Sequence, residues 1–268
     1  MGMTPSPTAS PDVSVVREPS VYLVGSQMVH ESSIDQFLED HGITWSTDTQ
    51  VGGERLSEAA GRVCYMSFGK GRKTNEEYLG HIIGVGHGSV LEHAVWNFII
   101  TGVSRSFTHE LIRHRAGFAY SQLSQRYVDE STADYVEPDI IAEDPELHAL
   151  WLEAVTKCQD VYRRLVDGLA AKLEEHPDRT LRRKIARQAA RSVLPNACET
   201  KIFVSANARA LRHFIELRGN EHADTEIRAV AIKVLKLMQE AAPSMFGDYV
   251  IRNHDDGTEI AETPNRKV

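Results

Sequence analysis

Residues 105–127 have the sequence RSFTHELIRHRAGFAYSQLSQRY, which holds four arginines, two histidines, two glutamines and a glutamate. That density of hydrogen-bonding side chains is greater than a solvated surface needs. Val103, Phe107 and Leu111 recur every four residues, which predicts a helix whose spacing stops at Gly117. A helix that ends in Arg-His-Arg and then turns sharply would direct cationic groups to one place. The stretch therefore predicts a pocket that binds an anion and a base.

The composition is that of an ordinary globular protein. Of the 268 residues, 41% are hydrophobic and 25% are charged, and the formal net charge is −8. A protein that wraps DNA or RNA normally has a basic balance or a basic face, so we expect no nucleic-acid partner. A small phosphorylated ligand held by a local arginine cluster is compatible with this charge.

Cysteine usage and hydropathy indicate the compartment. Cys64, Cys158 and Cys198 are odd in number and form no C-x-x-C motif, which indicates a reducing compartment and argues against a disulfide or zinc framework. No apolar run approaches the length of a membrane span, and no signal peptide is recognisable. We therefore expect a cytoplasmic protein without a membrane partner.

Hydrophobic periodicity predicts the order of the elements. Residues 1–19 are rich in Pro, Ser and Thr and are expected to form a disordered tail. Helices are predicted near 33–38, 54–65, 75–85, 144–173, 178–194, 208–218 and 224–241, and strands at 21–25, 95–100 and 199–205. An Asp256-Gly257 turn after Val250 predicts a short hairpin near the C-terminus.

Apolar residues at helical spacing predict which helix faces are buried. The expected stripes are Leu56, Ala59, Ala60 and Val63; then Leu147, Leu150, Ala154, Cys158, Val161, Leu165 and Leu169; then Leu181, Ile185 and Ala189. Arg183, Arg187 and Arg191 form a stripe opposite the last of these. Arginines on a helix face are usually solvated, so spacing alone does not favour any of them as a ligand contact.

His87 and Ser89 are flanked by glycines, ahead of the apolar run from Val95 to Ile100. From spacing alone, a helix-to-strand turn with a capping serine is the favoured interpretation. The functional alternative is that glycine lets a ligand approach the backbone, with His87 and Ser89 facing it.

Two motifs resemble known sites without matching them. His109-Glu110 and His114 suggest a zinc-protease helix, but histidines five residues apart are separated by about 140° and cannot share one metal. The basic run GKGRK at 69–73 lacks the frame of a P-loop and is expected to be exposed. The sequence therefore predicts no metal site.

No nucleophile is indicated either. Ser121 and Ser124 lie in no G-x-S-x-G elbow, and no cysteine stands beside a histidine. Arginine forks match phosphate oxygens and the polar edge of a pyrimidine, so the remaining chemistry is recognition of a nucleotide. The residues alone do not name the reaction.

Arg113-His114-Arg115 followed by SQLSQRY at 121–127 resembles the signature of the flavin-dependent thymidylate synthases. The resemblance extends over roughly residues 20–250 and includes GHGSVLEH at 86–93, RSFTHELIRHR at 105–115, RRKIARQAARSVLPNA at 182–197 and NARALRHFIELRGNEHADTEIR at 207–228. One departure is the spacer Ala116–Leu123 between R-H-R and the serine, which at eight residues is one longer than in the family signature. It affects the expected placement of Ala116–Tyr120.

The resemblance implies an α+β fold that is mostly helical with a small antiparallel sheet. It further implies one domain over residues 20–252, tails at 1–19 and 253–268, and a homotetramer with active sites shared between subunits. The implied reaction is reductive methylation of dUMP to dTMP in de novo dTMP biosynthesis. The carbon donor is 5,10-methylenetetrahydrofolate, and NADPH-reduced FAD is the hydride source.

The resemblance also assigns site residues, which match the family motif position by position. Contacts to dUMP are implied for Glu110, Leu111, Ile112, Arg113, Gln122, Leu123, Ser124, Gln125, Arg126, Arg191 and Arg218. Contacts to FAD are implied for Ser89, Arg113, His114, Arg115, Gln122, Asn207, Ala208, Arg209 and His213. The implied catalytic residues are Arg218, at the uracil N3 edge, and His87, near flavin and folate. A fixed guanidinium there would stabilise charge that develops on the pyrimidine.

Two alternatives stay open at this point. One is a flavoenzyme that keeps the pocket but methylates a different uracil nucleotide. The other is a non-catalytic nucleotide- or RNA-binding module that uses the R-H-R cluster, against which the net acidity of the chain argues.

Overall fold

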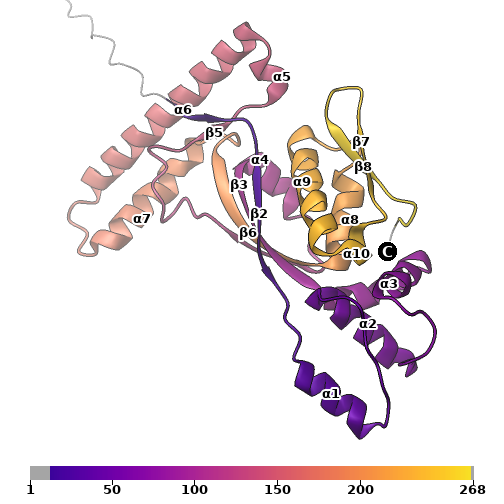
Figure 1. Cartoon of the computed structure of the whole chain (residues 1–268). Coiled ribbons are helices and arrows are strands. Elements are labelled where there is room, and N and C mark those ends of the chain that lie inside the picture. Colours follow the sequence, from indigo (N-terminus) through magenta and orange to yellow (C-terminus); the bar gives the residue numbers. More distant parts are fainter. Residues whose placement is uncertain (1–12, 267–268) are drawn as a thin grey trace, which may run out of the picture. The chain divides into compact units, whose positions relative to one another are not determined.

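The computed structural model describes residues 13–266 (Figure 1). The elements in chain order are β1 (Val15–Val16), β2 (Ser20–Ser26), α1 (Glu31–Asp40), α2 (Gly52–Tyr65), α3 (Asn75–Gly84), η1 (Gly88–His93), β3 (Val95–Ser104), α4 (Arg105–Leu111), β4 (Phe118–Gln122), β5 (Tyr135–Val136), α5 (Asp139–Ala142), α6 (Pro145–Lys172), α7 (Arg179–Ala190), η2 (Arg191–Val193), β6 (Glu199–Asn207), α8 (Ala208–Arg218), α9 (Thr225–Ala241), α10 (Pro243–Phe246), β7 (Val250–Asn253) and β8 (Glu259–Glu262). Helices dominate and the sheets are small, so the predicted fold class is confirmed.

The chain divides into two compact units. Within the described residues, unit 1 contains 13–19, Thr101–His109 and Gln122–Lys201, and unit 2 contains Ser20–Ile100, Glu110–Ser121 and 202–266. Of the tail expected over residues 1–19, residues 1–12 lie outside the described part of the chain. Val15–Val16 form β1, which pairs in parallel with β5.

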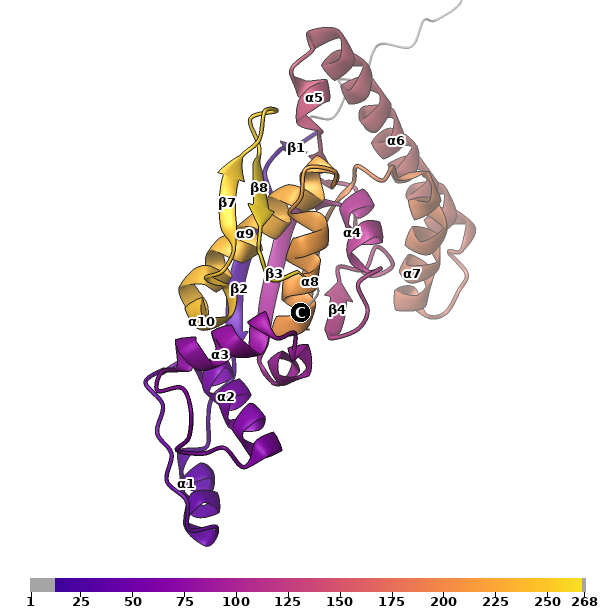
Figure 2. The ribbon, with the colours of Figure 1, turned by 90° about the vertical axis from the view of Figure 1, so that its right-hand side faces the viewer.

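In unit 1, helices α6 and α7 lie side by side, as both views show (Figures 1 and 2). Asp144 caps α6: its carboxylate accepts from the N–H groups of Glu146 and Leu147 at 2.9 and 3.1 Å. Although α6 runs for 28 residues, no helix in the described part of the chain combines the length and apolar character that a membrane span requires.

The predicted buried faces of α6 and α7 are wrong. The side chains that α6 buries are Val155, Gln159 and Tyr162, and those that α7 buries are Ala186 and Ala190. Exposed apolar residues of the predicted stripes are Leu147, Leu150, Leu165, Leu181 and Ile185. The small residues Ala186 and Ala190 of α7 allow the two helices to approach closely. The periodicity of large apolar side chains does not reveal this contact, because it does not show which face of a helix packs against a neighbour.

In unit 2, the central sheet has the strand order β2-β3-β6-β4, with β3 and β6 continuing into unit 1. The predictions of β2, β3 and β6 are confirmed. Strand β4 (Phe118–Gln122) was not predicted, because its alternation of aromatic and small polar side chains lacks the β-branched residues that usually indicate a strand.

Helix α2 buries its polar face and not the predicted apolar stripe. Its buried residues are Gly53, Glu54, Ser57, Glu58, Gly61 and Arg62, while Val63 is exposed. The glycines allow close packing: a Cβ on Gly53 would lie 2.9 Å from the Trp96 ring, and one on Gly61 would lie 2.5 Å from the Tyr78 hydroxyl. The buried charges of this face are paired within unit 2.

The predicted C-terminal hairpin is confirmed, since β7 and β8 pair antiparallel. It packs against α8 and α9 (Figure 2). The Ala261 N–H donates to the Gly219 carbonyl at 2.7 Å, directly after the last residue of α8. Inside α8, the buried Arg212 forms a bidentate pair with Asp248 at 2.6 and 2.8 Å. Residues 259–265 therefore contact the helix that carries much of the predicted site.

Candidate active site

The turn after α4 places the Arg-His-Arg motif. The helix ends at Leu111, earlier than predicted, and the His114 N–H still donates to the Leu111 carbonyl at 3.0 Å. The hydroxyl of Tyr120 lies 3.0 Å from the Leu111 carbonyl oxygen and 2.6 Å from that of His114. Strand β4 thus folds back over the turn and fixes the direction in which Arg113–Arg115 leave the backbone.

Gly117 is required where the turn meets α8. Its φ is +75°, in the left-handed region. A Cβ there would lie 2.6 Å from Asn207 Nδ2 and 2.7 Å from the Ala210 Cβ. The Gly117 carbonyl also accepts from the Asn207 N–H at 3.0 Å. The predicted break at Gly117 is therefore a point of close contact between the R-H-R turn and the start of α8.

A cavity of about 520 Å³ lies between the R-H-R turn and α8, entirely within unit 2. Helix α8 contributes Ala210, His213, Leu217 and Arg218, which recur at helical spacing along one side. The turn and β4 contribute Arg113, His114, Arg115, Ala116 and Phe118. Five predicted site residues, Arg113, His114, Arg115, His213 and Arg218, are thus brought together around one space.

Glu110 links the two arginines that flank this cavity. Its Oε2 lies 2.9 Å from Arg218 Nη2, and its Oε1 lies 3.4 Å from Arg113 Nη1. Arg218 also donates from Nε to His114 Nε2 at 3.1 Å. The guanidinium of Arg218 is therefore oriented on two sides. An anionic or carbonyl edge of a planar ligand would meet a fixed fork of donors.

His114 is kept neutral in this setting. Burial and then the neighbouring Arg218 charge lower the pKa of His114 from 6.5 to about 4. Its ring lies 5.3 Å from the Phe214 ring and 6.0 Å from the Phe118 ring, so aromatic side chains contribute to its burial. Because Nε2 accepts from Arg218, the proton of the neutral ring is on Nδ1.

A second group of predicted residues lies where η1 meets the start of α8. The Asn207 side chain caps α8 by accepting from the Ala210 N–H at 2.8 Å, and Arg209 forms an ion pair with Glu92 of η1. Ala208 is buried, so only its backbone could meet a ligand. Ser89 lies on η1 itself.

His87 precedes η1, and its ring stacks on Tyr65 at the end of α2, with centroids 6.5 Å apart and planes inclined by 20°. It does not line the cavity beside Arg218. Leu111 is buried and Ile112 is half exposed, so any contact of Leu111 with a ligand would use its backbone.

The remaining predicted residues belong to unit 1. Gln122 donates to Thr108 Oγ1 at 3.1 Å and to Thr200 Oγ1 at 3.3 Å. Leu123 is held through its backbone, since its N–H donates to the Lys201 carbonyl at 2.9 Å and its carbonyl accepts from Arg105 Nη2 at 2.9 Å. This short segment therefore has a defined backbone path.

The following residues are anchored in a buried cluster. The Gln125 amide lies 3.7 Å from Cys198 Sγ, which lies 3.8 Å from Glu130 Oε2. Burial raises the pKa of Cys198 to about 12 and also raises the pKa of Glu130. A thiol with such a pKa is no nucleophile. Burial lowers the pKa of Arg105, and the charge of Arg191 lowers it further.

Ser124, Arg126 and Arg191 complete the unit 1 group. Ser124 Oγ accepts from the Arg126 N–H at 3.4 Å, and the Nε of Arg126 is buried without a protein partner in the described part of the chain. Arg191 begins η2 and is exposed. Arg187, which we expected to be solvated, instead donates to the Tyr127 carbonyl and to Asp129, because α7 packs against this loop.

Sequence reasoning missed several residues that shape these sites. Tyr120 and Phe118 build the turn and the cavity wall, and Arg105 holds Leu123. All three lie within the polar stretch 105–127. Their long-range partners give them these positions, and a one-dimensional pattern does not show such partners.

This chain is similar in sequence and in fold to known proteins. A family model described as thymidylate synthase complementing protein matches residues 47–244. The flavin-dependent thymidylate synthase of Mycobacteroides abscessus is 53% identical over 231 residues, which cover 85% of this chain and 92% of the relative. That of Mycolicibacterium gilvum is 53% identical over 232 residues, with the same coverage.

Among solved structures, the UMP/dUMP methylase PolB from Streptomyces cacaoi, bound with 5-Br dUMP, has a similar fold. Its TM-score is 0.65 at 19% identity, over 88% of this chain and 96% of that chain. Sequence identity with the curated relatives and the family model agree with the motifs around the R-H-R turn. The chain therefore belongs to the flavin-dependent thymidylate synthase family.

Proposed function

We propose that this protein converts dUMP to dTMP, with 5,10-methylenetetrahydrofolate as carbon donor and NADPH as reductant of bound FAD, in cytoplasmic de novo dTMP synthesis. The observation that carries the proposal is the oriented Arg218. Its guanidinium is fixed by Glu110 and His114 at the wall of a cavity that also holds Arg113.

Arg218 supplies the electrostatic part of catalysis in this proposal. Addition at C6 of a uracil ring moves negative charge onto O4 and N3. A guanidinium that is already oriented stabilises this charge without reorganisation. Glu110 prevents Arg218 from turning away and leaves part of its fork free for the ligand. The chain needs no protein nucleophile under this scheme.

The described residues fit a flavin. FAD carries a diphosphate and a flavin ring edge with hydrogen-bond acceptors. Unit 2 offers Arg113, Arg115, Arg209 and Ser89 as donors beside the cavity and the start of α8. His114 and His213 would contact the cofactor from the same side. When bound, the flavin supplies the hydride chemistry. The chain's own part is to bind, to orient and to exclude water.

The nucleotide phosphate and sugar are assigned to unit 1. Gln122–Arg126 follow a fixed backbone path, and Arg126 has a buried Nε without a protein partner in the described residues. Burial is the main cause that lowers the pKa of the neighbouring Arg105, and the charge of Arg191 lowers it further. The buried Nε of Arg126, without a protein partner among the described residues, and the exposed position of Arg191 support the assignment of dUMP contacts to these two arginines.

We propose that four copies assemble and share active sites. The apolar side chains that α6 and α7 leave exposed support this proposal, because a stripe of Leu and Ile on a long helix is typical of a covered surface. Light scattering should give a mass of about four subunits. An active monomer would refute the shared-site proposal.

A direct experiment tests the proposed reaction. The purified protein should be yellow, NADPH should bleach its flavin without oxygen, and dUMP with methylenetetrahydrofolate should then yield dTMP. Replacing dUMP by UMP tests the alternative of another uracil nucleotide. A colourless protein that takes up no added FAD would refute the proposal and favour a non-catalytic nucleotide-binding module.

A further inference from the structure

Helix α2 buries a row of charge that no catalytic role explains. Glu54, Glu58 and Arg62 are spaced by four residues and are 1%, 1% and 3% exposed. Burial raises the pKa of Glu54, whose carboxylate accepts from Thr49 Oγ1 and from the Ser244 N–H. Buried charges contribute little net stability compared with apolar packing, but they impose one geometry on their partners. The partners therefore indicate what this row specifies.

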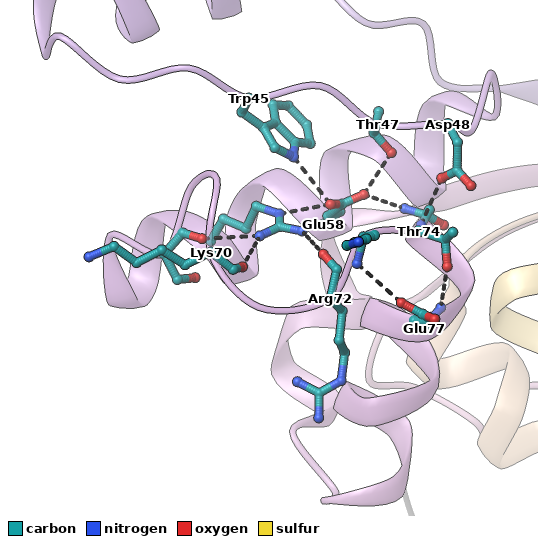
Figure 3. A network of polar contacts seen from close by, with 12 residues as sticks. Trp45, Thr47, Asp48, Glu58, Lys70, Arg72, Thr74 and Glu77 are labelled. Atoms are coloured by element: carbon teal, nitrogen blue, oxygen red, sulfur yellow. Dashed lines mark hydrogen bonds and ion pairs between the residues drawn. The ribbon is translucent and has the colours of Figure 1, made fainter.

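Glu58 joins α2 to the segments on either side (Figure 3). It accepts from Trp45 Nε1 at 3.2 Å, Thr47 Oγ1 at 2.7 Å and Asn75 Nδ2 at 2.8 Å. It also accepts from Arg62 Nε at 2.7 Å. Each carboxylate oxygen of Glu58 thus accepts two hydrogen bonds.

The other nitrogens of Arg62 hold a loop. Nη1 donates to the carbonyls of Ser67 at 3.0 Å and Lys70 at 3.1 Å, and Nη2 donates to that of Arg72 at 3.2 Å. Positive φ angles at Gly69 and Gly71, +68° and +80°, let the backbone curl around this one guanidinium. A surface loop that would otherwise be mobile is thereby given a defined shape.

This shape turns the carbonyls inward and the basic side chains outward. Figure 3 shows the Lys70 and Arg72 side chains pointing away from Glu58. Lys70, Arg72 and Lys73 are exposed, and none forms an ion pair with any residue between 13 and 266. On a chain with a net charge of −8, a rigid loop with three free cations is an attractive site for an anion.

The position of the loop relative to His87 indicates which kind of anionic ligand could reach it. The loop begins after Tyr65 and Met66, and Tyr65 stacks on His87. Lys70 follows Met66, the residue after α2, by four positions, so its Cα lies within about 14 Å of that of Met66. A ligand whose reactive end reaches His87 can therefore place a charged far end on the loop.

We propose that residues 69–73 bind the anionic end of a co-substrate, an inference that rests on the proposed function. Two ligands of that reaction have such an end: the γ-glutamyl carboxylates of a folate and the 2′-phosphate of NADPH. Both are multiply charged and would meet the same three cations. The Arg62 contacts use only backbone carbonyls, so side-chain truncation leaves the loop's shape intact.

The test compares ligands that differ only in this charge. The variant carries Lys70→Ala, Arg72→Ala and Lys73→Ala. At low ionic strength we expect its KM for one charged ligand to be about tenfold higher than that of the wild type, with kcat little changed. A higher KM for triglutamyl but not for monoglutamyl methylenetetrahydrofolate assigns the site to carboxylates. A higher KM for NADPH but not for NADH assigns the site to the 2′-phosphate. Direct titration of NADP⁺ against NAD⁺, followed calorimetrically, should show the same difference without turnover.

Two controls separate this inference from its premises. Replacing three exposed cations of unit 1, Lys172, Arg179 and Arg183, by Ala removes the same charge and should leave both ligand preferences as in the wild type. Equal changes in both members of each pair, or no change, would overturn the loop proposal. If the wild-type protein forms no dTMP at all, the proposed function fails first, and the calorimetric comparison alone decides the loop.

Discussion

The Nε of Arg218 donates to Nε2 of His114 at 3.1 Å, and this bond couples the guanidinium that faces the cavity to the turn that carries Arg113 and Arg115. Since Glu110 holds the opposite side of the same guanidinium, neither the turn nor α8 can shift without moving Arg218.

Replacing Arg218 tests whether its proposed catalytic role is separate from flavin binding. Arg218→Ala should lower kcat for dTMP formation by a hundredfold or more, because oriented charge at the pyrimidine edge is lost. FAD affinity should fall much less, and flavin absorbance on titration measures it. Arg218→Lys keeps the charge but not the fork, so it should restore little activity. Equal losses of turnover and FAD affinity in Arg218→Ala would contradict this role.

The neutral state of His114 makes stability depend on pH. Its pKa is about 4 in the folded protein and about 6.5 when unfolded, so the unfolded chain binds more protons between these values. The stability that neutral His114 contributes to the folded protein is fully present above pH 6.5 and is lost as the pH falls from 6.5 towards 4. In this window His114→Asn should reduce the pH slope of the unfolding free energy by up to about 1.4 kcal/mol per pH unit. Denaturant unfolding at several pH values measures it, and equal slopes would show that His114 is not the group responsible.

Gly117 should tolerate no side chain. Gly117→Ala combines a φ of +75° with contacts of 2.6 and 2.7 Å to Asn207 and Ala210, so we expect a loss of about 2–4 kcal/mol in unfolding free energy. Gly80→Ala is the matched control in the same unit, because it lies within α3 with open space around it. That variant should be neutral or more stable by about 0.5–1 kcal/mol. Similar unfolding midpoints for both variants would argue against a close contact at Gly117.

Ser124 should prove to be a binding residue. Its hydroxyl accepts from the Arg126 N–H at 3.4 Å, and no basic group activates it among its described contacts. Ser124→Ala should therefore keep measurable dTMP formation, with the larger change in the KM for dUMP. If the variant bound dUMP normally but lost all activity, a nucleophilic serine would have to be reconsidered.

The sequence predicts the elements of this fold better than it predicts their contacts. Strands β2, β3 and β6, the Asp144 cap and the C-terminal hairpin follow from local patterns, because local chemistry determines them. The buried face of α2 does not, since Glu58 and Arg62 are paired with groups from other segments. The exposed stripe on α6 shows the converse case, in which an apolar pattern does not reveal whether this chain covers it.

The candidate site divides in the same way. Motifs locate Arg113–Arg115, His213 and Arg218, and the structure places them around one cavity. The orientation of Arg218 depends on Glu110 and on a neutral His114, which no spacing rule provides. The contribution of Tyr120 depends on two backbone carbonyls. Chemistry-bearing residues can thus be predicted from sequence more readily than the contacts that aim them.

The hydrogen bond from Ala261 to the Gly219 carbonyl has a practical consequence for anyone handling this protein. The strand that makes it lies 43 positions after Arg218 in the chain, yet it holds the residue next to Arg218. An affinity tag, a fusion partner or proteolysis after residue 253 would therefore disturb the end of α8 at Arg218, which lines the cavity. Purification handles belong at the other terminus.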